Sequence, residues 1–318
     1  VPHMAEHHID AMTLTPAPVN FPAPIEEGDT RAICSPAGPV DPAKVAGAVA
    51  VLEQQGWRTK VMPHALGSHG NFSGTADERY ADMAAALTDP EVRAVLCSRG
   101  GYGVVHIMDR LARLPLADDP KWVIGFSDIS AMHALMASKG VASIHSPMAA
   151  QIMKGTSDAD TASLFGILRG ERPAYVFPSH EFDRRGIASG RLFGGNLAVL
   201  AELISTPYDI IVPDSILFLE DVAEPIYKIE RIFYQLRLSG VLGRLRGLIV
   251  GQFTEYRPDR NYTDMESMIR DATAGCNYPI AFGVPIGHVD HNLPVIESAE
   301  VTLKVSPSGT NSLIFHRS

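Results

Sequence analysis

Residues 121–145 read KWVIGFSDISAMHALMASKGVASIH. The apolar run WVIGF is followed by a segment with helical spacing of its apolar residues, which Gly140 ends, and then by a second apolar run, VASIH. Two apolar strands joined by a helix are typical of a parallel sheet that helices cover on both faces. This stretch therefore predicts an α/β fold, and it puts Ser127 directly after the end of a buried strand.

The same alternation of strands and helices extends toward the N-terminus. Helix starts are predicted at Asp41, which precedes a proline, and at Thr75, which opens the capping-box sequence TADE. The apolar run VRAVLCS, residues 92–98, predicts a further strand. Ligands bind to such sheets beyond the carboxyl ends of the strands, so we expect a site near RGGYG (99–103) and SDIS (127–130).

The second half of the chain is predicted to form another, smaller unit with a mixed α/β pattern. The polar, glycine-containing stretch SHEFDRRGIASG is typical of a linker, and the strand and helix patterns after it include a helix that Thr263 would cap. The expected organisation is an extended N-terminal arm at residues 1–27, a parallel-sheet domain at 28–170, a linker at 171–190 and a C-terminal domain at 191–318.

Charge and composition narrow the classes of partner. The 318 residues carry a formal net charge of −9 without a run of Lys or Arg, so neither nucleic acid nor an anionic membrane is an expected partner. No apolar run approaches the roughly 20 residues of a membrane-spanning helix, and the first residues do not resemble a secretory signal. Cys34, Cys97 and Cys276 are expected to be reduced thiols, and the expected location is the cytoplasm.

Ser127 in GFSDI is a candidate nucleophile. A serine between a buried strand and a helix stands on a sharp turn that exposes its hydroxyl beside the first N–H groups of the helix, as in a nucleophile elbow. The pattern differs from the G-x-S-x-G of α/β-hydrolases, because Ile129 stands where their second glycine would be. The alternative is that Ser127 only caps the helix, which is the common role of a serine at this position.

The glycines of SRGGYG offer a place for backbone donors. Their spacing matches neither G-x-G-x-x-G nor a phosphate-binding loop, so the sequence does not favour a nucleotide site. The N–H of Gly101, together with that of Asp128, could instead stabilise an oxyanion formed next to Ser127. A simple tight turn is the alternative.

A serine nucleophile needs a base and a group that orients the base. His288 in GHVDH and Glu220 at the end of SILFLE both follow predicted strands, so both are candidates. A solvated loop histidine and a surface carboxylate are the alternatives. His288, Asp290 and His291 could also suggest a metal site, although their spacing is not that of a zinc hydrolase and no metal is expected.

Seven segments, in order along the chain from about Ile33 to Val301, resemble one family. They are SPAGPVD, SRGGYG, IGFSDIS, HSPM, GRLFGGNLAVLAELISTPYD, LFLEDVAEPIYKIERIFYQLRLSGVL and GVPIGHVDHNLPV. The family is that of the LD-carboxypeptidases, serine peptidase family S66. The resemblance implies a flavodoxin-like N-terminal domain, a C-terminal domain with a small sheet, and an active site in the cleft between them.

The resemblance also implies an activity and the roles of three residues. Ser127 would be the nucleophile, His288 the base and Glu220 the acid that orients it. The implied reaction removes the terminal D-alanine from murein tetrapeptides in cytoplasmic peptidoglycan recycling, by a homodimer and without a cofactor. Other interpretations are a microcin-immunity peptidase, which cleaves peptidyl-nucleotides with the same triad, and a non-catalytic protein that binds muropeptides.

Substrate contacts are expected from four further residues. Asn196 of GGNL matches a cleft position of the family, and Glu224 could bind the cationic end of the diamino acid or only stabilise the helix that follows it. An acidic residue at 224 favours a murein peptide over a nucleotide substrate, which a basic residue would suit better. Arg99 and Arg191 are candidates for binding the carboxylate of D-alanine.

Overall fold

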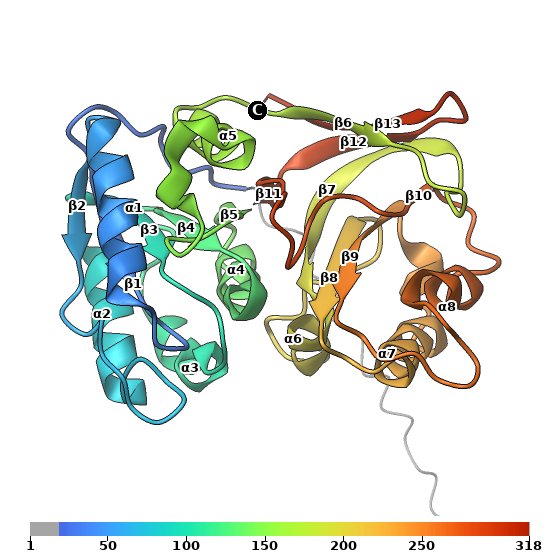
Figure 1. Cartoon of the computed structure of the whole chain (residues 1–318), viewed down its shortest axis with the longest axis horizontal. Coiled ribbons are helices and arrows are strands. Elements are labelled where there is room, and N and C mark those ends of the chain that lie inside the picture. Colours follow the sequence, from blue (N-terminus) through green and yellow to red (C-terminus); the bar gives the residue numbers. More distant parts are fainter. Residues whose placement is uncertain (1–18, 318) are drawn as a thin grey trace, which may run out of the picture.

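The computed structural model describes residues 19–317 and contains two β-sheets. Figure 1 shows the N-terminal half, in blue to green, beside the C-terminal half, in yellow to red. The strands are β1 (Thr30–Cys34), β2 (Arg58–Val61), β3 (Val92–Cys97), β4 (Trp122–Gly125), β5 (Ser143–His145), β6 (Ala174–Pro178), β7 (Gly186–Asn196), β8 (Ile216–Val222), β9 (Gly247–Thr254), β10 (Ile280–Ala281), β11 (Val295–Glu297), β12 (Glu300–Val305) and β13 (Thr310–Phe315). The helices are α1 (Pro42–Gln54), α2 (Ala76–Thr88), α3 (Met108–Leu111), α4 (Ser130–Ser138), α5 (Ala159–Leu168), α6 (Leu197–Glu202), α7 (Ile226–Leu238) and α8 (Met265–Ala272).

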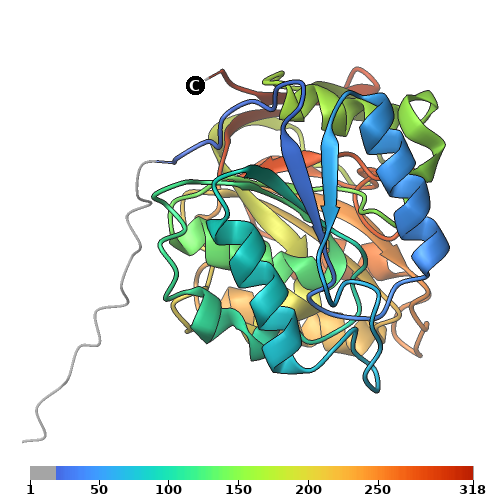
Figure 2. The ribbon, with the colours of Figure 1, turned by 90° about the vertical axis from the view of Figure 1, so that its left-hand side faces the viewer.

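The first sheet confirms the predicted parallel α/β domain. Its strand order is β11-β5-β4-β3-β1-β2, and β1 to β5 are parallel. This is the 2-1-3-4-5 order of flavodoxin-like sheets with one strand added at an edge. Buried apolar side chains of α1 and α5 belong to one core cluster and those of α2, α3 and α4 to another. Figure 2 shows helices on both sides of this sheet.

The added edge strand comes from the far end of the chain. β11 pairs antiparallel with β5, so that Val295 lies opposite His145 and Glu297 opposite Ser143. Residues 295–297, which were expected in the C-terminal domain, therefore complete the sheet of the first one. As a result, the loop that carries His288 leaves the second sheet after β10 and ends on the first sheet.

The second sheet is mixed, as predicted for the C-terminal domain. Its order is β10-β9-β8-β7-β12-β13-β6, in which β7 to β10 are parallel and the remaining pairs are antiparallel. Residues 171–190 are not a linker, because 174–178 form β6 and 186–190 begin β7. The polar residues 179–185 that suggested a linker form only the short connection between these two strands, and residues 186–190 of the same stretch already belong to β7.

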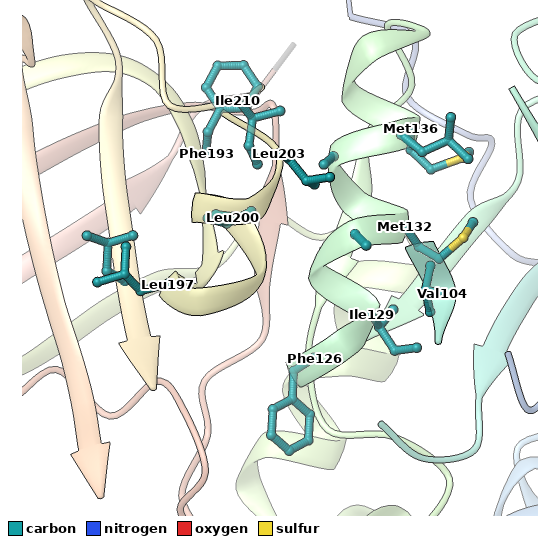
Figure 3. Close-up of a cluster of buried hydrophobic side chains, with 14 of the residues drawn as sticks. Val104, Phe126, Ile129, Met132, Met136, Phe193, Leu197, Leu200, Leu203 and Ile210 are labelled. Atoms are coloured by element: carbon teal, nitrogen blue, oxygen red, sulfur yellow. The ribbon is translucent and has the colours of Figure 1, made fainter. Parts of the chain in front are cut away.

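Apolar side chains of α4 and α6 join the two domains. α4 packs on α6 and on β7. Figure 3 shows Leu200 and Leu203 beside the helix that carries Met132 and Met136, and all four side chains are buried. They belong to one apolar cluster that continues from the first domain into the second. The position of one domain on the other is thus set by core packing.

Most of the predicted helix starts are confirmed, and one is displaced by a residue. Asp41 caps α1, and Thr75 forms a complete capping box with Glu78 at the start of α2. The prediction that Thr263 caps a helix is wrong, because Asp264 caps α8 and its side chain accepts the backbone N–H three residues later. Two adjacent residues of TDME are good caps, and the sequence pattern alone does not choose between them.

The described part of the N-terminal arm is attached to the first domain. Asn20 forms a parallel bridge with Val141, and the carbonyl of Ala23 accepts the indole N–H of Trp122 at 3.2 Å. Of the arm expected at residues 1–27, the structure describes only residues 19–27, and residues 1–18 lie outside the described part of the chain.

The cysteines are free thiols, as expected. Burial raises the pKa of Cys97 to about 12 and that of Cys34 well above its ordinary value, so both stay protonated. Among residues 19–317, no helix combines the length and the apolar character needed to cross a bilayer.

The narrow packing of β7 against β8 gives a first prediction. A Cβ at Gly194 would collide with the carbonyl oxygen of Phe218 and lie 2.5 Å from its ring, whereas a Cβ at Gly243 would meet no atom within 4 Å. We expect Gly194→Ala to lower the free energy of unfolding by about 1–3 kcal/mol or more, because β8 must move. Gly243→Ala, the matched control, should change it by less than about 0.5 kcal/mol. Urea unfolding of both variants measures the difference, and equal stabilities would contradict the packing described here.

Candidate active site

Ser127 stands on the sharp turn between β4 and the helical segment that leads into α4. Its φ is +63°, in the left-handed region that residues other than glycine seldom adopt. The helical turn that begins at Ser127 has Phe126 as its N-cap residue and no side-chain cap. The serine hydroxyl does not cap this helix but lies 3.1 Å from Nε2 of His288. The structure therefore has the geometry of the predicted elbow rather than that of a helix cap.

Two glycines make room for this turn. A Cβ at Gly125 would lie 2.8 Å from the side chain of Ile129, the residue that replaces the second glycine of the α/β-hydrolase pattern. A Cβ at Gly100, in the loop after β3, would lie 2.9 Å from Cβ and 3.0 Å from Oγ of Ser127. The loop with the sequence RGGYG thus touches the serine turn, as expected for two neighbouring strand ends.

His288 comes from the loop between β10 and β11 and contacts both other predicted residues. Its Nδ1 lies 2.8 Å from Oε2 of Glu220, and its Nε2 lies 3.1 Å from Oγ of Ser127. A neutral imidazole with its proton on Nδ1 donates to the carboxylate and leaves Nε2 to accept the serine hydroxyl proton. The structure brings together all three residues that the sequence predicted, from three separate elements.

The loop that carries His288 is held by a residue that sequence reasoning missed. Asp160 in α5 is 1% exposed; its Oδ2 accepts the backbone N–H of Asn292 at 2.7 Å and lies 3.0 Å from Nδ1 of His291. The side chain of Asn292 accepts the N–H of Gly287 at 3.0 Å. Nothing in the sequence around Asp160 indicates this contact, because α5 precedes the loop by more than a hundred residues.

The possible metal cluster in GHVDH is not assembled. His288 faces Ser127 and Glu220, whereas His291 pairs with Asp160. Within residues 19–317, no group of three or more His, Cys, Asp or Glu side chains has a geometry suited to a metal ion.

Glu220 is fully buried near the end of β8. Gly287 packs closely against it, because a Cβ at Gly287 would lie 3.1 Å from the Cβ of Glu220. Oε2 bonds to His288, and Oε1 lies 3.4 Å from Nδ2 of Asn196. A buried carboxylate needs such partners, because an unpaired charge away from water is costly.

The pKa of His288 is raised above its ordinary value by a balance of opposing effects. Burial favours the neutral ring and lowers the pKa, but the hydrogen bond and the charge of Glu220, together with the charges of Asp221 and Glu255, stabilise the imidazolium and outweigh burial. Since a base must be neutral to accept a proton, the reactivity of Ser127 should increase as the pH rises through this raised pKa.

Aromatic and imidazole rings pack beneath His288. The ring of Phe126 lies 5.0 Å from that of His288 and 6.2 Å from that of His145, and His145 lies 5.0 Å from Phe218. Burial lowers the pKa of His145 well below its ordinary value, so this second histidine stays neutral and adds no charge to the site.

Asp128 attaches the glycine loop to the serine turn. Its carboxylate accepts the N–H of Val104 at 3.0 Å, just past the glycines of RGGYG. Burial raises the pKa of Asp128 to about 6, although the N–H groups of Val104 and Gly103 oppose the shift. Gly101 has a φ of +113° and lies in this attached loop. The N–H groups of Gly101 and Asp128 remain the predicted oxyanion donors.

The other predicted substrate residues differ in their surroundings. Nδ2 and Oδ1 of Asn196 both bond within the protein, and Glu224 is half-buried between β8 and α7. Arg99 is exposed beside the glycine loop, and its Nη1 donates to the carbonyl of Pro39 at 2.8 Å. Arg191 lies on β7 five residues before Asn196, a distance of about 16 Å along a strand, and its Nε lies 3.7 Å from Glu300. The structure therefore places Arg191 away from Asn196 along the strand.

The contact between His288 and Glu220 generates a second prediction. Glu220→Gln should slow the reaction of Ser127 with a fluorophosphonate by roughly 10⁴-fold, as in other serine triads that lose the orienting carboxylate. The acidic limb of the rate–pH profile should also move to lower pH, because burial still lowers the pKa of His288 while the raising effect of Glu220 is lost.

Intact-protein mass spectrometry of labelling between pH 5 and 9 measures both effects. Glu53→Gln, which removes the same charge from the exposed face of α1, serves as the control and should label like the native protein. An unshifted acidic limb in Glu220→Gln would show that Glu220 does not control the base.

Family models cover most of the chain. Residues 32–146 match the LD-carboxypeptidase N-terminal domain, and residues 189–303 match the LD-carboxypeptidase C-terminal domain. The murein tetrapeptide carboxypeptidase of Pseudomonas aeruginosa is 30% identical over 278 residues, which are 82% of this chain and 88% of that protein.

Solved structures show the same architecture. A crystal structure of muramoyltetrapeptide carboxypeptidase from Oxalobacter formigenes superposes with a TM-score of 0.81 at 26% identity, covering 91% of this chain and 99% of that one. The microcin C7 self immunity protein MccF, in complex with aspartyl sulfamoyl adenosine, also has a TM-score of 0.81 and covers 93% of this chain and 98% of its own, but at 19% identity the likeness concerns the fold alone. The chain belongs to the LD-carboxypeptidase family of serine peptidases.

Proposed function

We propose that this protein is a serine LD-carboxypeptidase that releases the terminal D-alanine from murein tetrapeptides. The observation that carries the proposal is the hydrogen-bonded series Ser127–His288–Glu220, with distances of 3.1 and 2.8 Å, in a member of this family. The tetrapeptide bond at issue joins the L-centre of diaminopimelate or lysine to D-alanine.

Acyl transfer would proceed through the three residues. Oγ of Ser127 attacks the carbonyl carbon of the diamino acid while its proton moves to Nε2 of His288. The imidazolium, stabilised by Glu220, then gives this proton to the nitrogen of D-alanine as the C–N bond breaks. Water attacks the resulting ester with His288 again as base, and the tripeptide leaves with a new carboxylate.

The oxyanion of the tetrahedral intermediate would be held by backbone donors. The N–H groups of Gly101 and Asp128 belong to two segments that the Asp128–Val104 hydrogen bond joins. A Cβ at position 100 would lie 3.0 Å from Oγ of Ser127 and 3.6 Å from N of Asp128, so the space beside the nucleophile depends on a glycine there. Removal of one such donor from other serine hydrolases costs about 10²–10³-fold in rate.

Two charged residues, one in the glycine loop and one after β8, would recognise the free amine of the diamino acid and the carboxylate of D-alanine. Glu224 follows Ala223, whose φ of +59° turns the chain between β8 and α7, and would attract the free amine of diaminopimelate or lysine. Arg99 would attract the carboxylate of D-alanine. The acidic residue at position 224 favours a murein peptide over a phosphate-bearing nucleotide substrate.

The proposed setting is peptidoglycan recycling in the cytoplasm by a homodimer. The support is the family resemblance, the acidic net charge of −9 and the three free cysteines. Peptidyl-nucleotide cleavage is the second candidate, because MccF, whose structure holds aspartyl sulfamoyl adenosine, has the same fold. Binding of muropeptides without catalysis is the third.

Release of D-alanine from L-Ala-γ-D-Glu-meso-diaminopimelate-D-Ala is the test of this proposal. We expect the native protein to release D-alanine, with or without a chelator, and Ser127→Ala to release none above background. The corresponding peptide with a terminal L-alanine is the matched substrate control, and the lysine-containing tetrapeptide compares the two diamino acids. Chiral chromatography with mass spectrometry identifies the product.

The other outcomes each favour a different function. Cleavage of aspartyl sulfamoyl adenosine without release of D-alanine would support the immunity-type activity. Saturable binding of the tetrapeptide without turnover would support a sensor. Release that persists in Ser127→Ala would contradict the role of the serine.

A further inference from the structure

Asn196 connects both domains to the acid of the site. It lies where β7 ends and α6 begins, and only 6% of its surface is exposed. Its backbone N–H donates to Oγ of Ser130 at 2.9 Å, and its Oδ1 accepts the N–H of Val199 at 3.2 Å. Its Nδ2 lies 3.0 Å from Oδ1 of Asp221 and 3.4 Å from Oε1 of Glu220.

These contacts complete a closed ring that crosses the domain boundary twice. From Ser127 the ring passes through His288 to Glu220, then through Asn196 to Ser130. Ser130 is three residues after Ser127 at the start of α4, so the backbone closes the ring. The nucleophile and the acid are therefore linked by two routes, one through the base and the other through Asn196.

We propose that Asn196 is a positioning residue that acts on the reaction through Glu220. Its amide fixes Oε1 of Glu220 so that Oε2 faces His288, and its backbone bond to Ser130 holds the end of β7 on the nucleophile helix. The proposal rests on the serine mechanism described above and deepens it. It replaces the sequence-based expectation that Asn196 contacts the substrate directly.

The need for such a residue follows from the burial of Glu220. A carboxylate has two oxygens to satisfy, and His288 occupies only Oε2 of the fully buried Glu220. The second carboxylate beside it, Asp221, accepts the N–H groups of Ala198 at 2.9 Å and Val222 at 2.8 Å. Since the amide of Asn196 donates toward both acids, it also offsets the repulsion between them.

β7 and α4 pack so closely that a movement of one would displace the other. Gly195 has a φ of +144°, and a Cβ there would collide with Oγ of Ser130 and lie 2.9 Å from its Cβ. α6, which follows β7, continues this contact because it also packs on α4. A displacement of Asn196 would thus shift Glu220 relative to the serine helix.

The test compares Asn196→Asp with a matched control elsewhere in the second sheet. The substitution keeps the shape and the oxygen that caps α6 but removes the amide donor. Asn311 is also buried, its Nδ2 donates to Asp183 at 2.8 Å and its Oδ1 accepts the N–H of Ser306. Because Asn311 is on β13, three strands from the β8 of Glu220, Asn311→Asp removes the same kind of donor outside the site. Ser130→Ala removes the acceptor of the backbone bond and tests the other half of the link.

Two readouts are measured for each variant, together with its stability in urea. One is kcat and KM for release of D-alanine, and the other is the rate at which a fluorophosphonate labels Ser127. We expect Asn196→Asp to lower kcat and the labelling rate by about 10–100-fold with KM unchanged. Loss of the residues that orient metal ligands through hydrogen bonds has an effect of this size in metalloenzymes. Ser130→Ala should lower both less, and the double variant should be less than additive. Asn311→Asp should keep native rates.

Three other results would overturn the proposal, and a fourth would overturn only the proposed substrate. A raised KM with native kcat and labelling in Asn196→Asp would make Asn196 a substrate contact. Native labelling with a loss of stability equal to that of Asn311→Asp would make it structural only. If Asn196→Asp does not fold, native labelling in Ser130→Ala would contradict the coupling. A native protein that labels at Ser127 but releases no D-alanine would instead contradict the proposed substrate and leave the labelling test decisive.

Discussion

The hydrogen bond between Oγ of Ser127 and Nε2 of His288 is the contact on which the rest of the structure depends. It joins a serine at the end of β4 in the first sheet to a loop that leaves the second sheet. Its length of 3.1 Å requires that two domains of different topology be held in a fixed relation. Three features hold the domains in this relation. They are the apolar contact of α4 with α6, the pairing of β11 with the first sheet, and the hydrogen bond of Asp160 to the loop that carries His288.

The site combines backbone strain with close approach of the main chain. Ser127 adopts a φ of +63°, at a cost of about 1–3 kcal/mol that the surrounding packing must offset. Gly100 and Gly125 permit the neighbouring segments to touch the turn, whereas a side chain at either position would occupy the space of Ser127 or Ile129. Catalytic groups on such a support are held in place before the substrate arrives, which reduces the reorganisation needed for reaction.

Much of the site followed from the sequence because parallel strands place their carboxyl ends at one edge. That rule located Ser127 and the glycine loop, and an apolar strand that ends in a carboxylate located Glu220. The family resemblance then selected His288 among twelve histidines. Periodicity predicted the helices at Asp41 and Thr75 because their caps act within a few residues.

The parts that sequence reasoning missed depend on contacts between residues distant in the chain. β11 is three residues long and joins a sheet built about 150 residues earlier, so its pattern is too short to indicate a partner. Asp160 looks like an ordinary residue in the first turn of a helix, and its role appears only when the His288 loop packs on it. The linker prediction failed because the polar residues 179–185 form only a short connection, and the pattern did not reveal the strands β6 and β7 on either side of it.

The central claim is that Ser127, activated across the domain boundary, forms the covalent bond to the substrate. A phosphonate diester analogue of the murein tetrapeptide, with phosphorus in place of the carbonyl carbon that is attacked, tests this directly when the adduct is mapped by tandem mass spectrometry. The account predicts one adduct per chain, on Ser127, and loss of D-alanine release in proportion to its formation. An adduct on another residue, or full release of D-alanine from protein completely modified at Ser127, would contradict it.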